Sequence, residues 1–562
     1  MSELRHRQEK LLKKSPALYI VMLAVWAVLC VALWYYFSRG FVSPPFEEGV
    51  SPNLALRIAA VVLLVLNAVF ISYFWLNGVK DFLYVIWFTL ARRRLERGYR
   101  RVLSADVSEA DDLVLMLYCT CNDFDGDSLE RCMRQSYRNC STVILDDSTQ
   151  EEYKAAVDAF AARHHLRVVR RADRKGFKAG NINNFLLSDE VKASGYSYAV
   201  ILDSDEVIPP DFIRECLRYF AVYDNVGIVQ ANHIATRNRN FFMKLFHIGV
   251  NSHWPTYQMM KHRYGFSSML GHGAMIRRDC YEAAGGFPHL VAEDLCLSIE
   301  MRNLGYTVAF APNIICEEEY PVDYVAFKKR HSKWTQGNLE FIKKYTGKIA
   351  RADMRWFEKL DIVLFTYNLP LTAIFALYIL LNIVLLPVMG VEIGRVYPLW
   401  MLVPTIVFFF SPMLNDVFTW LFRINIFRFL FYQLCVIVLY GSMFFTSLVS
   451  ALLGMLGKKA KFIVTPKNSH RMTFVHALRV QWKELAFSTA FIAVSLIFIR
   501  SFWPVFLIAM TGYLSFFLLF FANYRYAPGE ADDIDRETAA VTLDQNGLLG
   551  RRRLKKTALP AN

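Results

Sequence analysis

The chain has 562 residues, 54% of them hydrophobic and 15% aromatic, with a formal net charge of +14. Its mean hydropathy of +0.25 excludes a purely soluble protein of this length. Beside long apolar segments, the basic excess is more typical of the cytoplasmic flanks of membrane helices than of nucleic-acid binding, so we expect no nucleic-acid partner. The ten cysteines show neither zinc-finger nor disulfide spacing, and we expect reduced thiols.

The N-terminal block, 1–104, contains two segments long enough to cross a bilayer, 17–37 and 55–76. The first is longer than the apolar part of a usual signal peptide and lacks a small-residue cleavage site, which predicts a membrane helix. Basic residues gather before the first segment and after the second, whereas the loop between them holds one arginine and two glutamates. By the positive-inside rule both ends are cytoplasmic, and 79–100 should form an interfacial helix.

The C-terminal block, 351–526, should cross the membrane four times, at about 360–390, 398–421, 484–500 and 503–524. A further apolar run, 426–456, is either a seventh span or an interfacial helix. If it crossed the bilayer, the basic clusters after it would lie outside the cell, whereas an interfacial helix keeps every basic cluster inside. We favour the interfacial helix, which gives six spans.

This topology predicts a multi-pass protein of the cell membrane (inner or plasma membrane), with the domain between the blocks and both termini in the cytoplasm. The tail, 527–562, is polar, acidic and then basic, which predicts a disordered cytosolic segment.

The segment 105–350 alternates short apolar runs with polar, helical-looking stretches. Helices suit 151–164 and 179–193, and strands are expected at 113–121, 142–148, 166–171, 198–205 and 226–231. The alternation predicts an α/β domain with a mostly parallel sheet. Ligands bind beyond the carboxyl ends of such strands. Polar side chains follow three of these strands: Thr120, Asn122 and Asp123; Asp146 and Asp147; Asp203, Ser204 and Asp205.

The motif "LDSDEV" places two carboxylates, Asp203 and Asp205, at one strand end. Two like charges so close repel each other unless a cation lies between them, and hard oxygen ligands suit Mg²⁺ or Mn²⁺. A solvated pair of aspartates in a turn is the alternative for this motif taken alone.

Two further motifs carry charge near the predicted strand ends. Lys178 follows a glycine turn before a helix, where a phosphate or a carboxylate is a plausible partner and a plain basic turn is the alternative. Glu293 and Asp294 begin an amphipathic helix, where acids commonly serve as caps. An aspartate there could also act as a general base.

In this order the motifs resemble the membrane-embedded, processive family 2 glycosyltransferases, the type of cellulose, curdlan, chitin and hyaluronan synthases. The residues that carry the resemblance are "DD" (146–147), "KAGN" (178–181), "DSD" (203–205), "ED" (293–294) and "RHSKW" (330–334). It covers 113–345 and implies a GT-A domain inserted between transmembrane blocks.

Two details refine the resemblance. The segment "FIVTPK" (462–467), within 458–472, is similar to the gating loop of the cellulose-synthase branch, which follows an interfacial helix and so supports that interpretation of 426–456. The family's closing motif, Gln-x-x-Arg-Trp, departs here to Arg330, Lys333 and Trp334. Lysine cannot make the bidentate fork of arginine, so the departure bears on the sugar and product.

The resemblance implies a UDP-sugar-dependent hexosyltransferase that builds a β-glycan with inversion and secretes it through its own channel. Glucose is the preferred sugar, with a β-1,4 or β-1,3 linkage. Asp294 would be the general base, and Asp203 and Asp205 would hold Mg²⁺ or Mn²⁺ on the diphosphate. The residues expected to bind substrate are Thr120, Asn122, Asp146, Asp147, Lys178, Glu293, Arg330, Lys333, Trp334, Thr465 and Lys467.

Among these, Trp334 would stack on the acceptor sugar while Arg330 and Lys333 close over the diphosphate. Lys328 and Lys329, just before them, are expected to be surface charges near anionic lipid. The expected partners are the UDP-sugar, the growing polysaccharide, the bilayer and accessory export subunits. Two alternatives remain: a single-transfer enzyme that glycosylates a membrane lipid, and a non-catalytic scaffold or transporter component.

Overall fold

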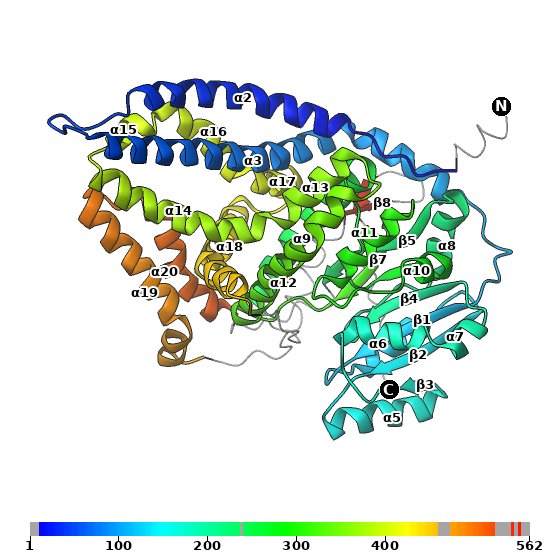
Figure 1. Ribbon diagram of the computed structural model, residues 1–562. Helices are drawn as coiled ribbons and strands as arrows, with labels where there is room; N and C mark the ends of the chain where they lie inside the picture. The colour runs from blue at the N-terminus through cyan, green and yellow to red at the C-terminus, as the bar shows by residue number, and fades with distance from the viewer. Residues whose placement is uncertain (1–9, 236–239, 459–471, 523–540, 544–548, 552–562) are drawn as a thin grey trace, which may run out of the picture.

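The computed structural model describes residues 10–235, 240–458, 472–522, 541–543 and 549–551. Figure 1 shows two parts, a group of long helices on one side and an α/β domain on the other. The expected gating-loop residues Thr465 and Lys467 lie outside the described residues.

The α/β domain is built on a seven-stranded sheet in the order β3-β2-β1-β4-β6-β5-β7. Strands β3, β2, β1 and β4 are parallel, β6 is antiparallel to both neighbours, and β5 pairs with β7 in parallel. This confirms the predicted mostly parallel sheet of a GT-A-type domain. The strands are β1 (Val114–Thr120), β2 (Cys140–Asp146), β3 (Arg167–Val169), β4 (Tyr198–Asp203), β5 (Val226–Ala235), β6 (Ala274–Arg277) and β7 (Thr307–Glu318).

The register brings the predicted polar strand ends to one edge. Thr120 at the end of β1 pairs with Asp146 at the end of β2, and Cys119 pairs with Asp203 at the end of β4. The long, bulged pairing of β5 with β7 and the strand β7 itself were not expected from the sequence.

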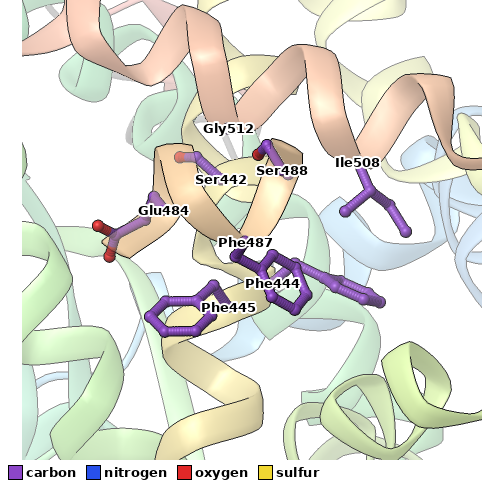
Figure 2. Close-up of a pocket in the computed structure, with 9 residues that line it drawn as sticks. Ser442, Phe444, Phe445, Glu484, Phe487, Ser488, Ile508 and Gly512 are labelled. Carbon is purple, nitrogen blue, oxygen red and sulfur yellow. The ribbon is translucent and has the colours of Figure 1, made fainter. Parts of the chain in front are cut away.

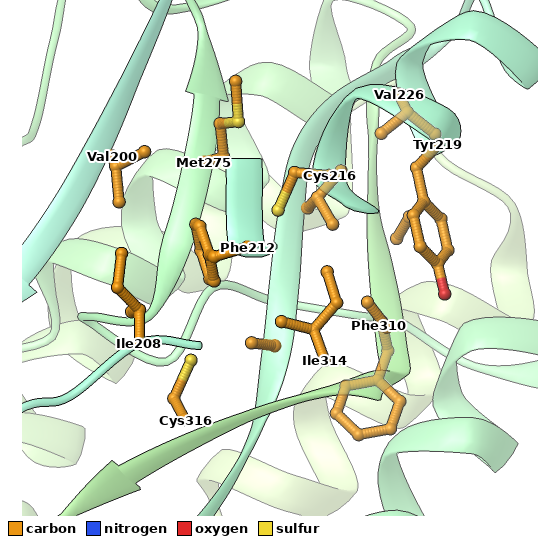
Figure 3. Packing of buried hydrophobic residues seen from close by; sticks show 14 of the residues in the cluster. Val200, Ile208, Phe212, Cys216, Tyr219, Val226, Met275, Phe310, Ile314 and Cys316 are labelled. Atoms are coloured by element: carbon orange, nitrogen blue, oxygen red, sulfur yellow. The ribbon is translucent and has the colours of Figure 1, made fainter. Parts of the chain in front are cut away.

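Helices cover both faces of the sheet, because side chains alternate along each strand. On β4, Val200 and Leu202 enter one buried apolar cluster while Ala199 and Ile201 enter the other. Figure 3 shows part of the first cluster, where Val200 and Met275 lie near Phe212 and Cys216 of α8. The domain's helices are α4 (Gly126–Met133), α5 (Glu151–His164), α6 (Phe177–Leu186), α7 (Asp189–Ala193), α8 (Phe212–Val222), α9 (Phe241–Tyr264), α10 (Arg278–Ala283), α11 (Glu293–Asn303) and α12 (Tyr324–Arg351).

The N-terminal block consists of two helices side by side, α2 (Ala17–Val42) and α3 (Leu54–Leu103). The expected interfacial helix at 79–100 is not a separate element, because residues 54–103 form one continuous helix of 50 residues, α3. At Gly78 a Cβ would lie 2.1 Å from the Cβ of Phe408, so this glycine marks a close contact between helices.

The C-terminal block departs from the expected boundaries in two places. The expected span 360–390 is two helices, α13 (Trp356–Thr366), with buried Glu358 and Asp361, and the apolar α14 (Asn368–Val388). The expected span 398–421 is a pair, α16 (Leu399–Phe409) and α17 (Ser411–Trp420), bent by 54° where a proline opens α17. The remaining elements are α15 (Ile393–Val396), α18 (Ile426–Met455), α19 (Phe474–Ile499), the 3₁₀ turn η1 (Trp503–Val505) and α20 (Phe506–Phe521).

By length and composition, six helices among the described residues could cross a membrane, or seven if the bent pair α16–α17 counts as one span. The six include α18. The described pieces of the tail, β8 (Val541–Leu543) and β9 (Leu549–Arg551), pair with each other, and Leu543 is buried. For these six residues the expected disorder is wrong.

Helix α18 lies along α12, and the two run in the same direction. At the start of α12, the Tyr324 hydroxyl lies 2.9 Å from Ser442 Oγ in the middle of α18. Farther along α12, Lys343 Nζ donates to the Gly454 carbonyl near the end of α18 at 2.8 Å. Because α12 carries Lys328, Lys329 and Arg330 among other cations, α18 accompanies a helix that is too charged to lie within lipid.

Candidate active site

The strand-end site is centred on Asp203 at the end of β4. Lys178, in the first turn of α6, pairs with the Asp203 carboxylate and also donates to the Gly271 carbonyl at 2.8 Å. Burial lowers the pKa of Lys178, but Asp203 and further neighbours such as Glu293 together outweigh it and the net shift is upward. Burial raises the pKa of Asp203, while Lys178 and His272 more than offset it, so this carboxylate is held ionised. The Asp203 side chain remains 38% exposed.

The second aspartate of the motif is fixed by the backbone. Asp205 accepts a hydrogen bond from the Glu319 amide at 3.2 Å, just beyond the end of β7. Ser204 between the two aspartates points away, donating to Asp123 at 2.8 Å. Both carboxylates thus sit at the strand edge with oxygens of the hard type that Mg²⁺ or Mn²⁺ prefers. The donor set of Asp203 and Asp205 fits such an ion.

The first acidic pair has a different environment. Arg170 Nε donates to Asp146 at 2.7 Å, and Arg171 makes a bidentate pair with Asp147 at 2.9 and 2.6 Å. Arg171 also donates to the carbonyls of Lys175 and Phe177. Asp147 therefore orders the turn that leads into Lys178. Sequence reasoning missed both arginines, because they lie in a segment predicted to be strand.

The residues after β1 mainly hold their own loop. Thr120 Oγ1 donates to Asp123 at 3.0 Å, and Asn122, with a left-handed φ of 59°, accepts from the Thr149 and Gln150 amides at 2.8 and 3.0 Å. The loop is thereby pinned beside the end of β2.

A second pair of carboxylates opens α11. The Leu295 amide donates to Asp294 at 2.8 Å, and a Cβ placed on Gly271 would lie 3.6 Å from Asp294 Oδ2. Burial raises the pKa of Asp294. Burial, and then the charge of Asp294, raise the pKa of Glu293. Lys178 opposes both shifts, so this pair faces the same cation as Asp203.

Helix α12 carries the closing motif over this site. Burial lowers the pKa of Lys333, with the charges of Glu293 and Asp203 opposing it. The guanidinium of Arg330 lies 4.4 Å from the ring centroid of Trp334, whose side chain is 43% exposed. The structure thus brings Lys178, Asp203, Glu293, Asp294 and Lys333 into one electrostatic cluster, with an exposed aromatic ring beside it.

The structure adds a buried group that the sequence analysis did not single out. Glu206 lies directly beneath the aspartate motif, hydrogen-bonded to His233 and His272, and His272 also contacts Glu318. His272 stands in the motif "GHG" (271–273). A histidine between two glycines could have indicated such a site, because glycines allow backbone conformations that place one side chain in a special position.

Lys328 corrects an expectation. Instead of forming surface charge, it pairs with the buried carboxylate of Glu484 on α19. Glu484 lines a small pocket between α18, α19 and α20, whose walls combine Phe445 and Phe487 with serine hydroxyls (Figure 2). The partner of Lys328 lies far along the sequence, so nothing near residue 328 indicated it. Lys329 remains exposed as expected.

Comparisons with known proteins identify the class. Residues 198–449 match the family model described as glycosyl transferase family group 2. This segment therefore matches a family 2 glycosyltransferase, in line with the resemblance of the ordered motifs. The matched region runs from β4 through most of α18 and includes Asp203, Asp205, Asp294 and the closing motif.

Two curated relatives point to glycan synthesis. The chain is 26% identical over 216 residues to a probable glucomannan 4-beta-mannosyltransferase 10 of Arabidopsis thaliana, covering 37% of this chain and 39% of the relative. It is 28% identical over 186 residues to the glucans biosynthesis glucosyltransferase H of Cereibacter sphaeroides, covering 30% of each. The alignments thus span about a third of the length of these relatives.

Among solved structures, the mannosyltransferase PcManGT of Pyrobaculum calidifontis, in complex with GDP-Man and Mn²⁺, overlaps with a TM-score of 0.39 at 18% identity. The overlap covers 67% of this chain and all of that one.

Proposed function

We propose that this protein is a processive, inverting glycosyltransferase that polymerises a β-glycan from a UDP-sugar and passes it through its own membrane channel. A β-glucan with 1,4 or 1,3 linkage is the preferred product. One observation carries the proposal: Lys178 faces both the ionised Asp203 and the half-buried Asp294, so a donor site and a basic carboxylate share one cation.

On the donor side, Asp203 and Asp205 would hold Mg²⁺ or Mn²⁺. The bound ion would neutralise the diphosphate and so favour its departure. Lys178 would keep Asp203 in place and lie near the phosphates. The loop of Thr120 and Asn122 would face the nucleoside, and Asp146 and Asp147 would orient Arg170 and Arg171 beneath it.

In the transfer step, the Asp294 carboxylate takes the proton from the acceptor hydroxyl. The hydroxyl oxygen then forms its bond to the anomeric carbon from the face opposite the diphosphate. The bond between that carbon and the diphosphate oxygen breaks, and UDP leaves with the electron pair. A single displacement inverts the anomeric centre, and no covalent intermediate on the protein is required.

On the acceptor side, Trp334 offers an exposed ring to the terminal sugar, while Arg330 and Lys333 cover the diphosphate. Arg330 stacks on Trp334, which supports the view that these two residues act together. Thr465 and Lys467 would join them from the gating loop when a donor is bound.

The membrane arrangement follows from α12 and α18. Because the second half of α18, from Ser442 to Gly454, lies along the cationic α12, we propose that α18 lies in the interface, with the catalytic domain and both termini cytoplasmic. Accessory export subunits would receive the polymer.

The test uses the full-length protein in membranes or detergent with labelled UDP-glucose, UDP-N-acetylglucosamine and GDP-mannose. We expect UDP-glucose to give a polymer that a linkage-specific β-glucanase digests. Asp294→Asn should reduce synthesis by about 1,000-fold, because it removes the base without changing shape. Asp279→Asn, which alters a carboxylate paired on the surface with Arg277, is the matched control and should leave synthesis unchanged.

Full activity of Asp294→Asn would exclude the base assignment. A product one sugar long on a lipid would instead establish the single-transfer alternative, and a protein that releases no nucleoside diphosphate from any donor would be the scaffold. Polymer from GDP-mannose alone would retain the mechanism and change the sugar.

A further inference from the structure

A buried cluster of acidic and imidazole groups lies directly below the aspartate motif. The Glu206 carboxylate is 0% exposed and accepts from His233 Nε2 at 3.1 Å, from His272 Nδ1 at 3.1 Å and from the Gly273 amide at 2.9 Å. On its other side, His272 Nε2 lies 3.1 Å from Glu318 Oε2. Both ring nitrogens of His272 are therefore held between two carboxylates.

The backbone around His272 is shaped to this cluster. Gly271 and Gly273 have positive φ angles of 95° and 58°, which favour glycine. A Cβ on Gly273 would lie 2.3 Å from both Glu206 Oε1 and His233 Nε2, so a side chain cannot fit there. Gln230, which is 1% exposed, holds the same segment through the Leu270 amide at 2.8 Å and the His272 carbonyl at 2.9 Å.

The segment held in this way, 270–273, contacts both halves of the candidate active site. The Gly271 carbonyl accepts from Lys178, the partner of Asp203. Gly271 also borders Asp294, whose Oδ2 lies 3.6 Å from the place a Cβ would occupy. A shift of this segment would therefore move Lys178 and Asp294 relative to each other.

We propose that His272 is a positioning residue which, clamped between Glu206 and Glu318, fixes the segment 270–273 and thereby the placement of Asp294 against the donor held at Asp203. The inference rests on the proposed function and deepens it. Because both ring nitrogens are already bonded to carboxylates, His272 acts through the backbone and not by touching the substrate.

A buried metal ion is the competing account of the same cluster. Glu206, His233 and Cys316 place one ligand atom each within 4.8 Å of one another, and all three are buried. The hydrogen bonds favour the positioning role, since Glu206 already receives four donors, from His233, His272 and the amides of Gly273 and Asp203. A cation at that position would have to break these hydrogen bonds.

The experiment measures turnover per UDP-binding site in the full-length enzyme, with sites counted by equilibrium binding of UDP. We expect His272→Ala to lower kcat by about 30-fold with the donor KM changed less than about twofold, because misplacing a base by roughly 1 Å costs transition-state stabilisation only. Glu318→Ala should lose kcat in the same way. Glu318→Gln, which keeps an acceptor for the His272 N–H, should recover most of that loss.

Counting sites separates positioning from simple misfolding, which lowers the number of sites but not the turnover of each. Turnover per site equal to the wild type in His272→Ala would overturn the inference, as would a raised donor KM with unchanged kcat. Stoichiometric transition metal in the purified protein, lost in Cys316→Ser, would replace it by the metal site. A wild-type protein that neither binds UDP nor turns over any nucleotide sugar would overturn the proposed function, and the inference with it.

Discussion

Two sets of carboxylates in the candidate active site have opposite electrostatics. At the end of β4, Asp203 pairs with Lys178, and its pKa is held below the ordinary value. At the start of α11, burial raises the pKa values of Glu293 and Asp294. Both sets face Lys178, yet one is kept ionised and the other is poised to take up a proton.

The difference indicates a division of labour. Groups whose surroundings push their pKa values apart are a common sign of an acid–base or metal role for one and a proton-transfer role for the other. A carboxylate held ionised and partly exposed suits a cation, whereas a carboxylate with a raised pKa suits a general base. The cation-binding role and the general-base role can be tested separately, beginning with the strand-end set, Asp203 and Asp205.

Removing either charge of the strand-end set should lower polymer synthesis strongly. Asp203→Asn and Asp205→Asn should each lower polymer synthesis by at least about 100-fold, because the diphosphate loses its charge stabilisation. Synthesis by the wild type should stop with EDTA and return with Mg²⁺ or Mn²⁺. Asp211→Asn, an exposed carboxylate nearby in the sequence, is the control. Synthesis by the wild type at its full rate in EDTA would exclude a divalent cation bound by Asp203 and Asp205.

The carboxylates at the start of α11, Glu293 and Asp294, should determine how kcat/KM depends on pH. Asp294 acts in its ionised form, and its raised pKa means that protonation begins at a higher pH than the ordinary value of 3.8. Below this raised pKa, kcat/KM should fall by about tenfold per pH unit, as expected for one essential base. The profile of kcat/KM should be measured with saturating divalent cation. A fall that begins only at or below pH 3.8 would mean that the pKa of the essential base is not raised, in contradiction to the proposed role of Asp294.

The strand-end set could be located from the sequence, because apolar β-forming runs ending in aspartate fix both the strand and its carboxyl end. Asp146 and Asp203 meet the same edge through their pairing with β1, as a parallel sheet requires. The partners of these residues could not be located. Arg171 lies in a segment predicted to be strand and no partner was predicted for His272, because only the folded chain brings these residues to Asp147 and Glu206.

The helical regions illustrate a second limit. Hydropathy found the long helices but not their boundaries. It separated 55–76 from 79–100, which are one continuous helix, and it missed the break between α16 and α17, which depends on a proline within an apolar run. Helix α9 was not expected at all. Its polar and aromatic residues follow no single face, and Pro255 lies inside it.

Changes to the first acidic pair, Asp146 and Asp147, should lower turnover less than changes to Asp203. Each of these two aspartates is paired with an arginine. The side chains of Asp147 and Arg171 are each 7% exposed. Asp147→Asn should destabilise the domain by about 3 kcal/mol, because it leaves a buried guanidinium without its counter-charge. Thermal unfolding should show a lower Tm, while turnover per UDP-binding site falls only a few-fold.

Arg171→Leu combined with Asp147→Asn supplies the control for this pair. If the pair is structural, the double variant should lose less stability than the sum of the two single variants. A large loss of turnover per site at unchanged Tm would instead place Asp147 with Asp203, among the groups that act on the donor.

The smallest effect concerns Lys333, the cation of α12 that faces both sets. Lysine offers a point charge, whereas arginine offers a planar fork that matches phosphate oxygens in a bidentate way. Lys333→Arg should therefore lower the donor KM by about threefold with kcat little changed, since the fork binds the diphosphate before and during transfer. Lys329→Arg, an exposed neighbour on the same helix, is the matched control. A donor KM unchanged in Lys333→Arg, with kcat lowered, would assign Lys333 to Glu293 and Asp294 instead of to the diphosphate, because its charge is then needed beside the base.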